Sequence, residues 1–355
     1  MIVSTVRVSR VTLPLARPIF YCTELLREWD SVFLYLESSG GVGIAEASLL
    51  SLPDWDMGNL ASLLEREIAP RLKGKSLENP EAIQRVLGRF ARCRPVAGLV
   101  DVAWWNLNAA EKNVPLYKAL GAEHVSQPIF TSLDQPLPDA EGNLCVDDFL
   151  ERAQRLFQSG VVHLELKVRP GWDIAMARFF RQENPDASFH LDIEGGMAEE
   201  QMDILLQFRD FFPRMIEQPF APEAFLTHGV LQGMLSCPVC LDESIVSLGS
   251  AQCASLMKSA QCLKINPIRV GGLSEAKKLV EWCREHDLEA WISSPLQSGV
   301  GMNTAFALGC LGGVAGPFEY YDWNDYFHEE DVEKLRELAP PLEPILDEEG
   351  VLRCE

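Results

Sequence analysis

The sequence predicts an α/β protein in which a parallel (β/α) barrel follows a smaller α+β domain. In the middle of the chain, short apolar segments recur about every 25 residues, the combined length of a strand, a helix and two short loops. Before residue 48 the apolar residues alternate as in strands, whereas residues 55–120 show helical periodicity. The chain has 355 residues, more than the roughly 250 of a barrel alone. Two domains are therefore expected.

Residues 1–125 are expected to form a capping domain. The stretch Ser38–Gly41 separates two alternating segments and predicts a hairpin. The helical segment Pro95–Lys112 carries its Ala, Leu and Trp residues at core spacing. The barrel should occupy residues 126–319, and the polar, proline-rich residues 320–355 should return to the capping domain. Within the capping domain, the expected strands are Val3–Leu13, Val32–Glu37 and Val42–Glu46.

Composition limits the classes of partner. Asp and Glu number 52 against 31 Lys and Arg, and the net charge of −21 argues against nucleic acid or an anionic membrane surface. No run of 18 apolar residues occurs, and Met1–Phe20 alternates like a strand rather than like a signal peptide. The ten cysteines are scattered, as expected for reduced thiols of a cytoplasmic protein. Packing explains the C-x-x-C pair Cys237 and Cys240 better than zinc or redox chemistry does, because Cys240 lies in a predicted strand.

Polar residues recur at one point in each predicted βα unit. The series is Lys167, Asp192, Glu217 and Asp242 at intervals of 25 residues, followed by Asn266 after 24. Each ends an apolar run, so all should lie at the C-terminal rim of the barrel, where barrel enzymes assemble their chemistry. Side chains two residues apart on a strand share a face. We therefore expect an inward-facing layer below the rim and one residue above it: Glu165, Cys240 and Lys264 below, and Glu194 above.

This series predicts a metal site with a lysine base. Three carboxylates form a hard oxygen site that suits Mg²⁺ better than Zn²⁺. An ion there can polarise a substrate carboxylate and stabilise the enediolate that forms when a proton leaves the adjacent carbon. Lys167 is the candidate base, since a desolvated site near a cation lowers the pKa of an amine. One such residue alone would be interpreted as a surface charge, but four in register are far less expected by chance.

Longer motifs surround these positions. In the barrel they are Leu164 to Val168 with Pro170-Gly171-Trp172-Asp173, then Leu191-Asp192, Ile216 to Pro219, Leu241 to Ser244, and Arg269 to Leu273. Outside it they are Pro115-Leu116-Tyr117 with Leu120-Gly121, and Asn324 to Phe327 with Glu330-Asp331. The ordered set resembles the enolase superfamily over nearly the whole chain. The resemblance is closest to the o-succinylbenzoate synthase and N-succinylamino acid racemase branch of its muconate-lactonising subgroup.

The resemblance implies a fold and a set of roles. The fold is a (β/α)7β TIM-like barrel with an α+β capping domain that the C-terminal tail completes. Asp192, Glu217 and Asp242 would be the ligands of Mg²⁺, for which Mn²⁺ would substitute, and Lys167 the catalytic lysine of the second strand. Glu243, which follows the third ligand, is expected beside the site with Glu165 and Glu194.

The resemblance also implies where substrate binds. The loop after the seventh strand, with Gln297, Ser298 and Gly299, would hold a substrate carboxylate. The segment Phe20–Trp29 matches a mobile flap over the site, whose Tyr21 and Trp29 are candidates for substrate contact. Hairpin packing explains these two aromatic residues equally well.

Two positions depart from the family pattern. The family has Lys-x-Lys on the second strand, where this chain has Glu165 before Lys167, and a lysine on the sixth strand, where this chain has Asn266. Racemisation needs an acid and a base on opposite faces of the intermediate, whereas a syn elimination can use one lysine for both proton transfers. Asn266 and Lys264 are therefore further candidates for the catalytic set.

Lys264 has three open interpretations. It could meet Glu165 beneath the metal, because an unpaired buried charge is costly. One of the two residues could instead belong to an ordinary polar network. The third interpretation is that the amine of Lys264 extends upward beside Asn266 and takes the place of the missing lysine.

The predicted function is a Mg²⁺-dependent carbon–oxygen lyase that removes a proton α to a carboxylate and eliminates water. It would resemble an o-succinylbenzoate synthase and belong to menaquinone biosynthesis. The alternatives are a divergent lyase, cycloisomerase or racemase acting on another carboxylate, and a binding homologue that has lost turnover. The expected partners are a small carboxylate substrate and further copies of the chain in a homo-oligomer.

Overall fold

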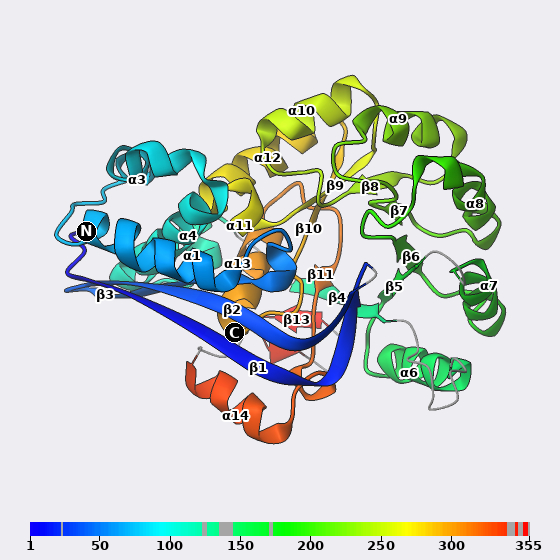
Figure 1. Ribbon diagram of the computed structural model, residues 1–355, viewed down its shortest axis with the longest axis horizontal. Coiled ribbons are helices and arrows are strands. Elements are labelled where there is room, and N and C mark those ends of the chain that lie inside the picture. The colour runs from blue at the N-terminus through cyan, green and yellow to red at the C-terminus, as the bar shows by residue number, and fades with distance from the viewer. Residues whose placement is uncertain are drawn as a thin grey trace.

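The computed structural model describes residues 1–22, 24–122, 126–134, 145–169, 173–338, 345–346 and 351–353. Within these residues the chain forms an antiparallel sheet with its own helices and a parallel barrel beside it (Figure 1). This arrangement confirms the predicted barrel with an α+β capping domain. The Pro170-Gly171-Trp172 part of the second-strand motif lies outside the described residues.

The capping sheet consists of the antiparallel strands β1 (Thr5–Tyr21), β2 (Glu24–Ser38) and β3 (Gly41–Ser48). Ser38 pairs with Gly41, so the predicted hairpin is present. β1 and β2 are longer than expected, because the predicted flap continues their pairing as far as Tyr21 and Glu24. The tip of this long hairpin therefore reaches the barrel (Figure 1).

The long helix α4 (Arg94–Lys112) packs against β3 and confirms the helix predicted for this segment. A Cβ atom added at Gly43 would lie 2.0 Å from the carbonyl oxygen of Ala103, so strand and helix approach too closely there for any side chain. The helix ends at Asn113, whose φ of 52° is left-handed. The other α-helices of this domain are α1 (Met57–Leu63), α2 (Ala69–Leu72), α3 (Pro80–Leu87) and α5 (Leu116–Leu120).

The barrel strands bring the rim residues into register. Lys167 pairs with Asp192, and Asp192 pairs with Glu217. The sheet returns on itself where β11 pairs with β4, and a bridge from Ala290 to Val314 spans the remaining gap. In the described part of the chain the parallel strands are β4 (Ser126–Leu133), β5 (His163–Lys167), β6 (Phe189–Asp192), β7 (Ile216–Glu217), β8 (Val239–Leu241), β9 (Cys262–Ile265), β10 (Glu289–Ile292) and β11 (Phe318–Glu319).

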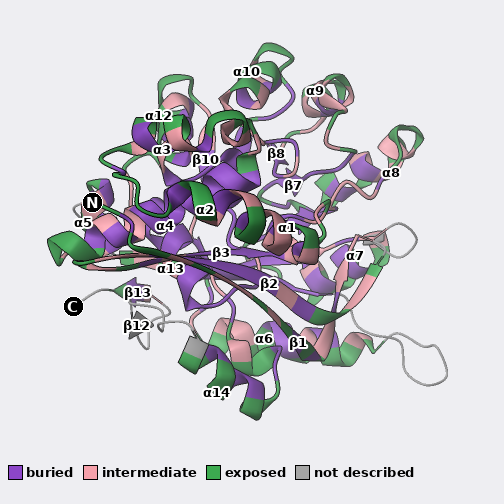
Figure 2. Ribbon diagram, turned by 60° about the vertical axis from the view of Figure 1, so that its left-hand side comes forward, coloured by how far each residue is buried: buried purple, intermediate pink, exposed green. Residues whose placement is uncertain are grey.

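Helices cover the outside of the barrel, with their buried faces toward the strands (Figure 2). The helix α12 shows the alternation of an outer helix, with Ala276, Leu279, Val280 and Cys283 buried, whereas α11 and α13 are buried almost throughout. The helices are α6 (Val146–Gln158), α7 (Asp173–Glu183), α8 (Met202–Gln207), α9 (Phe225–Met234), α10 (Leu248–Leu256), α11 (Pro267–Val270), α12 (Leu273–Glu285) and α13 (Gly299–Gly309).

The C-terminal segment contacts both parts of the molecule. Val332 and Leu335 of α14 (Glu329–Leu338) belong to a buried cluster with Trp29 and Phe33 of the capping sheet. β13 (Val351–Arg353) pairs with the barrel strand β4 and with β12 (Ile345–Leu346). The division at residues 125 and 319 stays a prediction.

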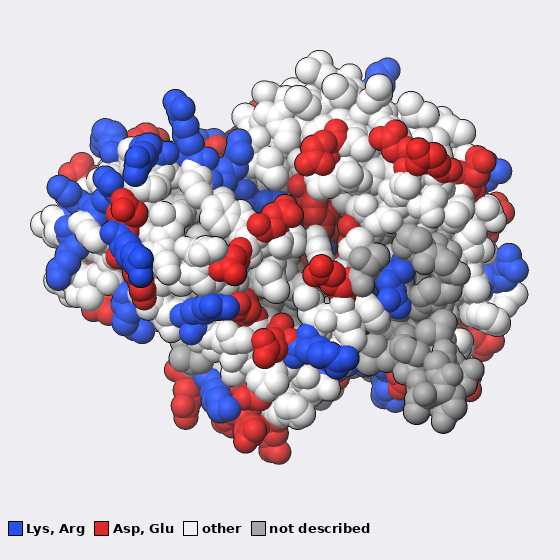
Figure 3. Space-filling model, viewed as in Figure 1, with Lys and Arg blue, Asp and Glu red and all other residues white. Residues whose placement is uncertain are grey.

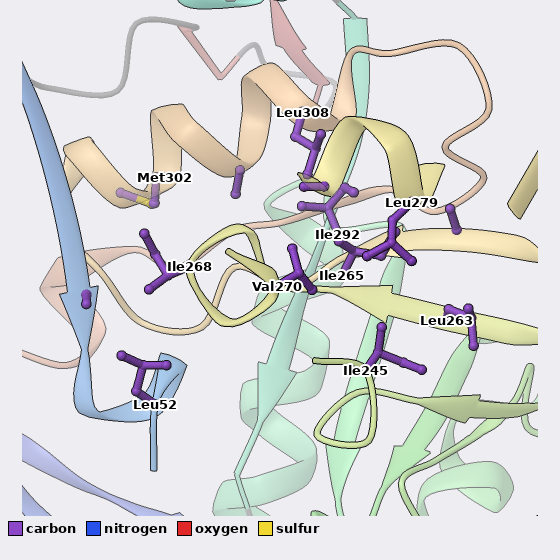
Figure 4. Close-up of a cluster of buried hydrophobic side chains, with 14 of the residues drawn as sticks. Leu52, Ile245, Leu263, Ile265, Ile268, Val270, Leu279, Ile292, Met302 and Leu308 are labelled. Atoms are coloured by element: carbon purple, nitrogen blue, oxygen red, sulfur yellow. The ribbon is translucent and has the colours of Figure 1, made fainter. Parts of the chain in front are cut away.

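One hydrophobic core extends from the capping domain into the barrel. Leu52 of the capping domain belongs to the same cluster as Ile268 of α11 and Met302 of α13 (Figure 4). Asp101 of α4 strengthens this junction, because it accepts hydrogen bonds from the amide and hydroxyl of Ser274 at the start of α12, at 2.9 and 2.6 Å. Among the described helices, none has the length and apolar character needed to span a bilayer.

Candidate active site

A cavity opens at the C-terminal rim of the barrel, beneath the hairpin tip. Acidic side chains gather around this hollow on the face shown in Figure 3. Most of the predicted charged residues line it, which is the outcome expected for neighbouring strand ends. The predicted residues that line the cavity are Tyr21, Lys167, Asp192, Glu194, Glu217, Asp242, Glu243 and Lys264.

Lys167 lies at the end of β5 among three carboxylates. Its Nζ is 2.6 Å from Asp192 Oδ2 and 3.0 Å from both Glu165 Oε1 and Glu194 Oε1. Burial acts to lower the pKa of Lys167, but the charges of Asp192, Glu165 and Glu194 together raise it well above its usual value. The amine is therefore protonated in this arrangement. The lowered pKa expected near a cation stays a prediction, because here the carboxylates outweigh desolvation.

Lys264 occupies the layer below the rim. Its Nζ is 2.6 Å from Glu165 Oε2 and 3.0 Å from Glu217 Oε1, and Glu319 Oε2 lies 3.7 Å away. The contact predicted between Glu165 and Lys264 is thus confirmed. The amine of Lys264 therefore does not extend upward beside Asn266. Burial acts to lower the pKa of Lys264, but these carboxylates raise it well above the usual value.

Asn266 has a structural task at the rim of β9. Its side-chain oxygen accepts hydrogen bonds from the amides of Ile268 and Arg269, at 3.1 and 3.2 Å, and so caps helix α11. The sequence interpretation treated this position as part of the catalytic set. The structure instead engages its oxygen with the backbone, because a helix begins directly after the strand.

In the described part of the chain, two sets of side chains are candidates for holding a metal ion. Glu165, His190 and Glu217 offer ligand atoms within 4.8 Å of one another, but the amine of Lys264 already lies between the two carboxylates. The rim set of Asp192, Glu217 and Asp242 lines the open cavity from consecutive strands. Its all-oxygen chemistry fits a hard divalent cation. Burial and the charges of Asp192, Glu165 and Asp242 raise the pKa of Glu217, with Lys264 opposing, so added positive charge there is stabilising.

The hairpin tip closes over this rim through polar contacts. Tyr21 donates a hydrogen bond to Glu243 Oε1 at 3.2 Å, and the amide of Cys22 donates to Glu194. Burial raises the pKa of Glu194 to about 7, with Lys167 opposing and Asp192 adding to the rise. Burial and Asp242 raise the pKa of Glu243 well above its usual value. The tip is therefore tied to two acids of the rim.

The other predicted substrate-binding residues do not line the cavity. Ser298 donates from its amide to Glu46 at 3.0 Å, and Gln297 donates to Ser294 at 3.2 Å. Gly299 begins helix α13. Trp29 packs in the capping cluster and donates from its indole to the carbonyl of Leu296 at 3.0 Å. A substrate-binding role for these residues stays a prediction, and for Ser298 it would need Glu46 to release the donors of that residue.

Several residues around the site were not predicted. Arg269 pairs with Asp242, at 2.9 Å, and Ser132 donates to Glu165. Tyr321 donates to Glu319 at 3.0 Å beneath the cavity. His190 precedes Asp192 by two residues on an inward face, so strand alternation was a signal that could have identified it. The spacing of two residues between Glu319 and Tyr321 was a similar local signal. The pairing of Arg269 with Asp242 had none, because the two residues follow different strands.

Two family descriptions match this chain. Residues 148–341 match the family described as Enolase C-terminal domain-like, and residues 3–121 match the mandelate racemase / muconate lactonizing enzyme N-terminal domain. The C-terminal match alone spans more than half of the chain. With the fold and the charged rim described above, the protein belongs to the enolase superfamily.

Several relatives are o-succinylbenzoate synthases or N-succinylamino acid racemases. The chain is 28% identical to an N-succinylamino acid racemase of Thermus thermophilus over 325 residues, 90% of this chain and 86% of the relative. It is 26% identical to an o-succinylbenzoate synthase of Bacillus subtilis over 330 residues, with 90% and 87% covered. A crystal structure of an enolase superfamily member from Listeria innocua has the same fold, with a TM-score of 0.85 at 24% identity over 99% of this chain and 92% of that one. The branch inferred from the motifs is thereby confirmed.

Proposed function

We propose that this protein catalyses a metal-dependent syn elimination of water from a carboxylate substrate, as an o-succinylbenzoate synthase does. The observation that carries the proposal is the asymmetry of the lysines. Lys167 borders the cavity, whereas the matching rim position of β9 is the helix cap Asn266. Relatives named o-succinylbenzoate synthase support the same reaction. Menaquinone biosynthesis would then be its pathway, and a cytoplasmic homo-oligomer its expected form.

The rim carboxylates are the proposed metal ligands. Asp192, Glu217 and Asp242 would hold Mg²⁺, or Mn²⁺ in its place, since the oxygen donors suit both ions. Bound there, the ion supplies positive charge to the substrate carboxylate while the α-proton leaves. The deeper Glu165 is a weaker candidate ligand, because both lysines already neutralise it.

Lys167 would carry the proton through the whole reaction. It would become a base once bound positive charge offsets the carboxylates that raise its pKa, of which Asp192, 2.6 Å away, is a proposed ligand. Its neutral amine takes the α-proton, and the electron pair of the C–H bond moves into the substrate carboxylate. The pair then returns to form the carbon–carbon double bond as the C–O bond breaks. The ammonium delivers the same proton to the leaving hydroxyl, so water departs and the amine is restored.

Racemisation is the second candidate, favoured by the relatives named N-succinylamino acid racemase. It requires a second acid or base on the opposite face of the substrate. Lys264 is the available amine, but its side chain is 3% exposed and its Nζ lies 2.6 Å from Glu165 and 3.0 Å from Glu217. Racemisation would therefore require this amine to leave two carboxylates. Another lyase or cycloisomerase reaction would keep the same base, and a binding homologue would have no need of the clustered carboxylates.

The test is a direct comparison of the two reactions on the full chain with Mg²⁺. We expect the protein to dehydrate the hydrated precursor of o-succinylbenzoate. We also expect that it does not interconvert the enantiomers of N-succinylamino acids, although one enantiomer exchanges its α-proton in D₂O. Lys167→Met is the matched inactive control and should stop both dehydration and exchange. Racemisation at a rate near that of dehydration would contradict the one-base proposal.

A further inference from the structure

Two histidines lie inside the barrel directly below the rim carboxylates, where such barrels usually pack apolar side chains. His163 comes from β5 and His190 from β6. The side chains are almost fully buried, with residue exposures of 4% and 0%. Their rings stack with centroids 5.0 Å apart and planes inclined by 15°. The Nε2 atom of His163 is 2.7 Å from the Nδ1 atom of His190.

The contacts of these rings form a directed chain of hydrogen bonds. His190 Nε2 lies 3.2 Å from Glu165 Oε2 and 3.1 Å from Glu217 Oε2. The two lysines keep Glu165 ionised, and an ionised carboxylate only accepts, so Nε2 of His190 carries the proton. With one proton on each ring, His190 Nδ1 accepts from His163 Nε2. His163 Nδ1 then accepts from the hydroxyl of Ser188, 2.7 Å away.

Aromatic side chains enclose the pair and limit its motion. Phe130 presents its ring to His163 at 6.0 Å and to His190 at 5.8 Å between centroids, both nearly edge-on. Trp291 makes similar contacts with both rings, at 5.6 and 5.7 Å. The enclosure leaves each imidazole the orientation that its hydrogen bonds require.

We propose that His190, held in one tautomer by His163 and Ser188, is a positioning residue that orients Glu217 toward the metal site and Glu165 between the two lysines. Packing alone does not account for the pair, because an apolar side chain of the same volume would leave two buried carboxylates with one donor fewer. Groups behind a metal ligand commonly set its orientation and its affinity for the ion. The metal part of this inference rests on the proposed function, whereas the hydrogen-bond direction does not.

The first experiment measures Mn²⁺ binding to the full chain by electron paramagnetic resonance of the free ion. His190→Leu should weaken binding about tenfold, the lower end of the range for partners of metal ligands, and His163→Leu should weaken it less. His190→Gln keeps a side-chain N–H donor and should recover most of the affinity. The control is His228→Leu on α9, a buried histidine whose Nε2 accepts from the amide of Phe220 at 3.2 Å. It should lower stability but change Mn²⁺ affinity by less than about twofold.

The second experiment needs neither a metal nor a variant. Nitrogen-15 spectra of the histidine side chains should show His163 and His190 both protonated at Nε2. A proton on Nδ1 of His190 would overturn the proposed chain, as would His190→Leu binding Mn²⁺ as tightly as the unaltered protein. An equal loss in His228→Leu would overturn the specific role of His190. Failure of the unaltered protein to bind Mn²⁺ would reject the proposed metal site, and the spectra would still decide the hydrogen-bond direction.

Discussion

The second and sixth barrel strands each present one lysine, but at different depths. On β5, Lys167 stands at the rim with 16% of its side chain exposed, whereas on β9, Lys264 stands one layer lower with 3% exposed. The rim position of β9 belongs to Asn266, which caps a helix. Both lysines line the cavity, but depth leaves the side chain of Lys167 partly exposed and that of Lys264 almost fully enclosed.

Glu165 connects the two regions. Its Oε1 atom is 3.0 Å from Lys167 and its Oε2 atom is 2.6 Å from Lys264. Burial acts to raise the pKa of Glu165, but the two lysines lower it well below the usual value, so it stays ionised. The first lysine of the family motif has become a shared counter-charge, and the two strands no longer offer equivalent bases.

The largest effect should come from the rim metal ligands. Asp192→Asn removes a proposed ligand and the negative charge 2.6 Å from Lys167, so activity should fall by about 10³-fold or more. Chelation with EDTA should abolish turnover, and Mg²⁺ or Mn²⁺ should restore it. Initial rates of dehydration give the measurement. The exposed Asp210→Asn serves as control, and full turnover in a metal-free sample would contradict the proposal.

The lower layer should affect stability more than chemistry. Glu165→Leu or Lys264→Leu alone leaves buried charge uncompensated and should cost about 3–5 kcal/mol in the free energy of unfolding. The double variant should cost less than the sum. It should not be neutral, because Lys264 also lies 3.0 Å from Glu217 and 3.7 Å from Glu319. Denaturant titration measures each value.

The exposed pair of Lys278 and Glu275, at 2.7 Å, provides the control for that experiment. Removing either of its members should change stability by less than about 1 kcal/mol, since water screens the pair. Strictly additive effects of the two buried substitutions would show that Glu165 and Lys264 do not act together.

Asp101 is a buried acid whose pKa shifts upward, in the opposite direction to that of Glu165. Burial raises the pKa of Asp101 from 3.8 to about 6, with the hydrogen bonds from Ser274 opposing. The folded state then binds the proton more tightly, so this contribution to stability is complete below pH 3.8 and is lost as pH rises through about 6. The loss is roughly 3 kcal/mol at most.

Asp101→Asn removes this titration, so its stability relative to the unaltered protein should improve between pH 4 and pH 7. Thermal unfolding of both proteins across this range provides the measurement. A constant difference at every pH would show that Asp101 has the same pKa in both states.

The smallest expected effect tests whether the depth of the second lysine in the barrel decides between elimination and racemisation. Asn266→Lys returns an amine to the rim of β9 and should introduce slow interconversion of N-succinylamino acid enantiomers. Loss of the α11 cap should cost about 1 kcal/mol. Chiral chromatography of the products measures the new activity. Asn266→Ala loses the same cap without adding an amine, so racemisation by that variant would count against the idea.

The sequence by itself determined the barrel and the rim series, and it offered the meeting of Glu165 with Lys264 as one of three interpretations. These follow from the period of the βα units and from the alternation of side chains along a strand, both of which are local properties. Only the tertiary structure decided which of the predicted polar side chains are already engaged by other parts of the protein. Ser298 is bound by Glu46, 252 residues away in sequence, and the cap role of Asn266 depends on where helix α11 begins. The pKa of Lys167 likewise depends on carboxylates from a neighbouring strand end, since electrostatic energy depends on distances that separate chain segments reach only on folding.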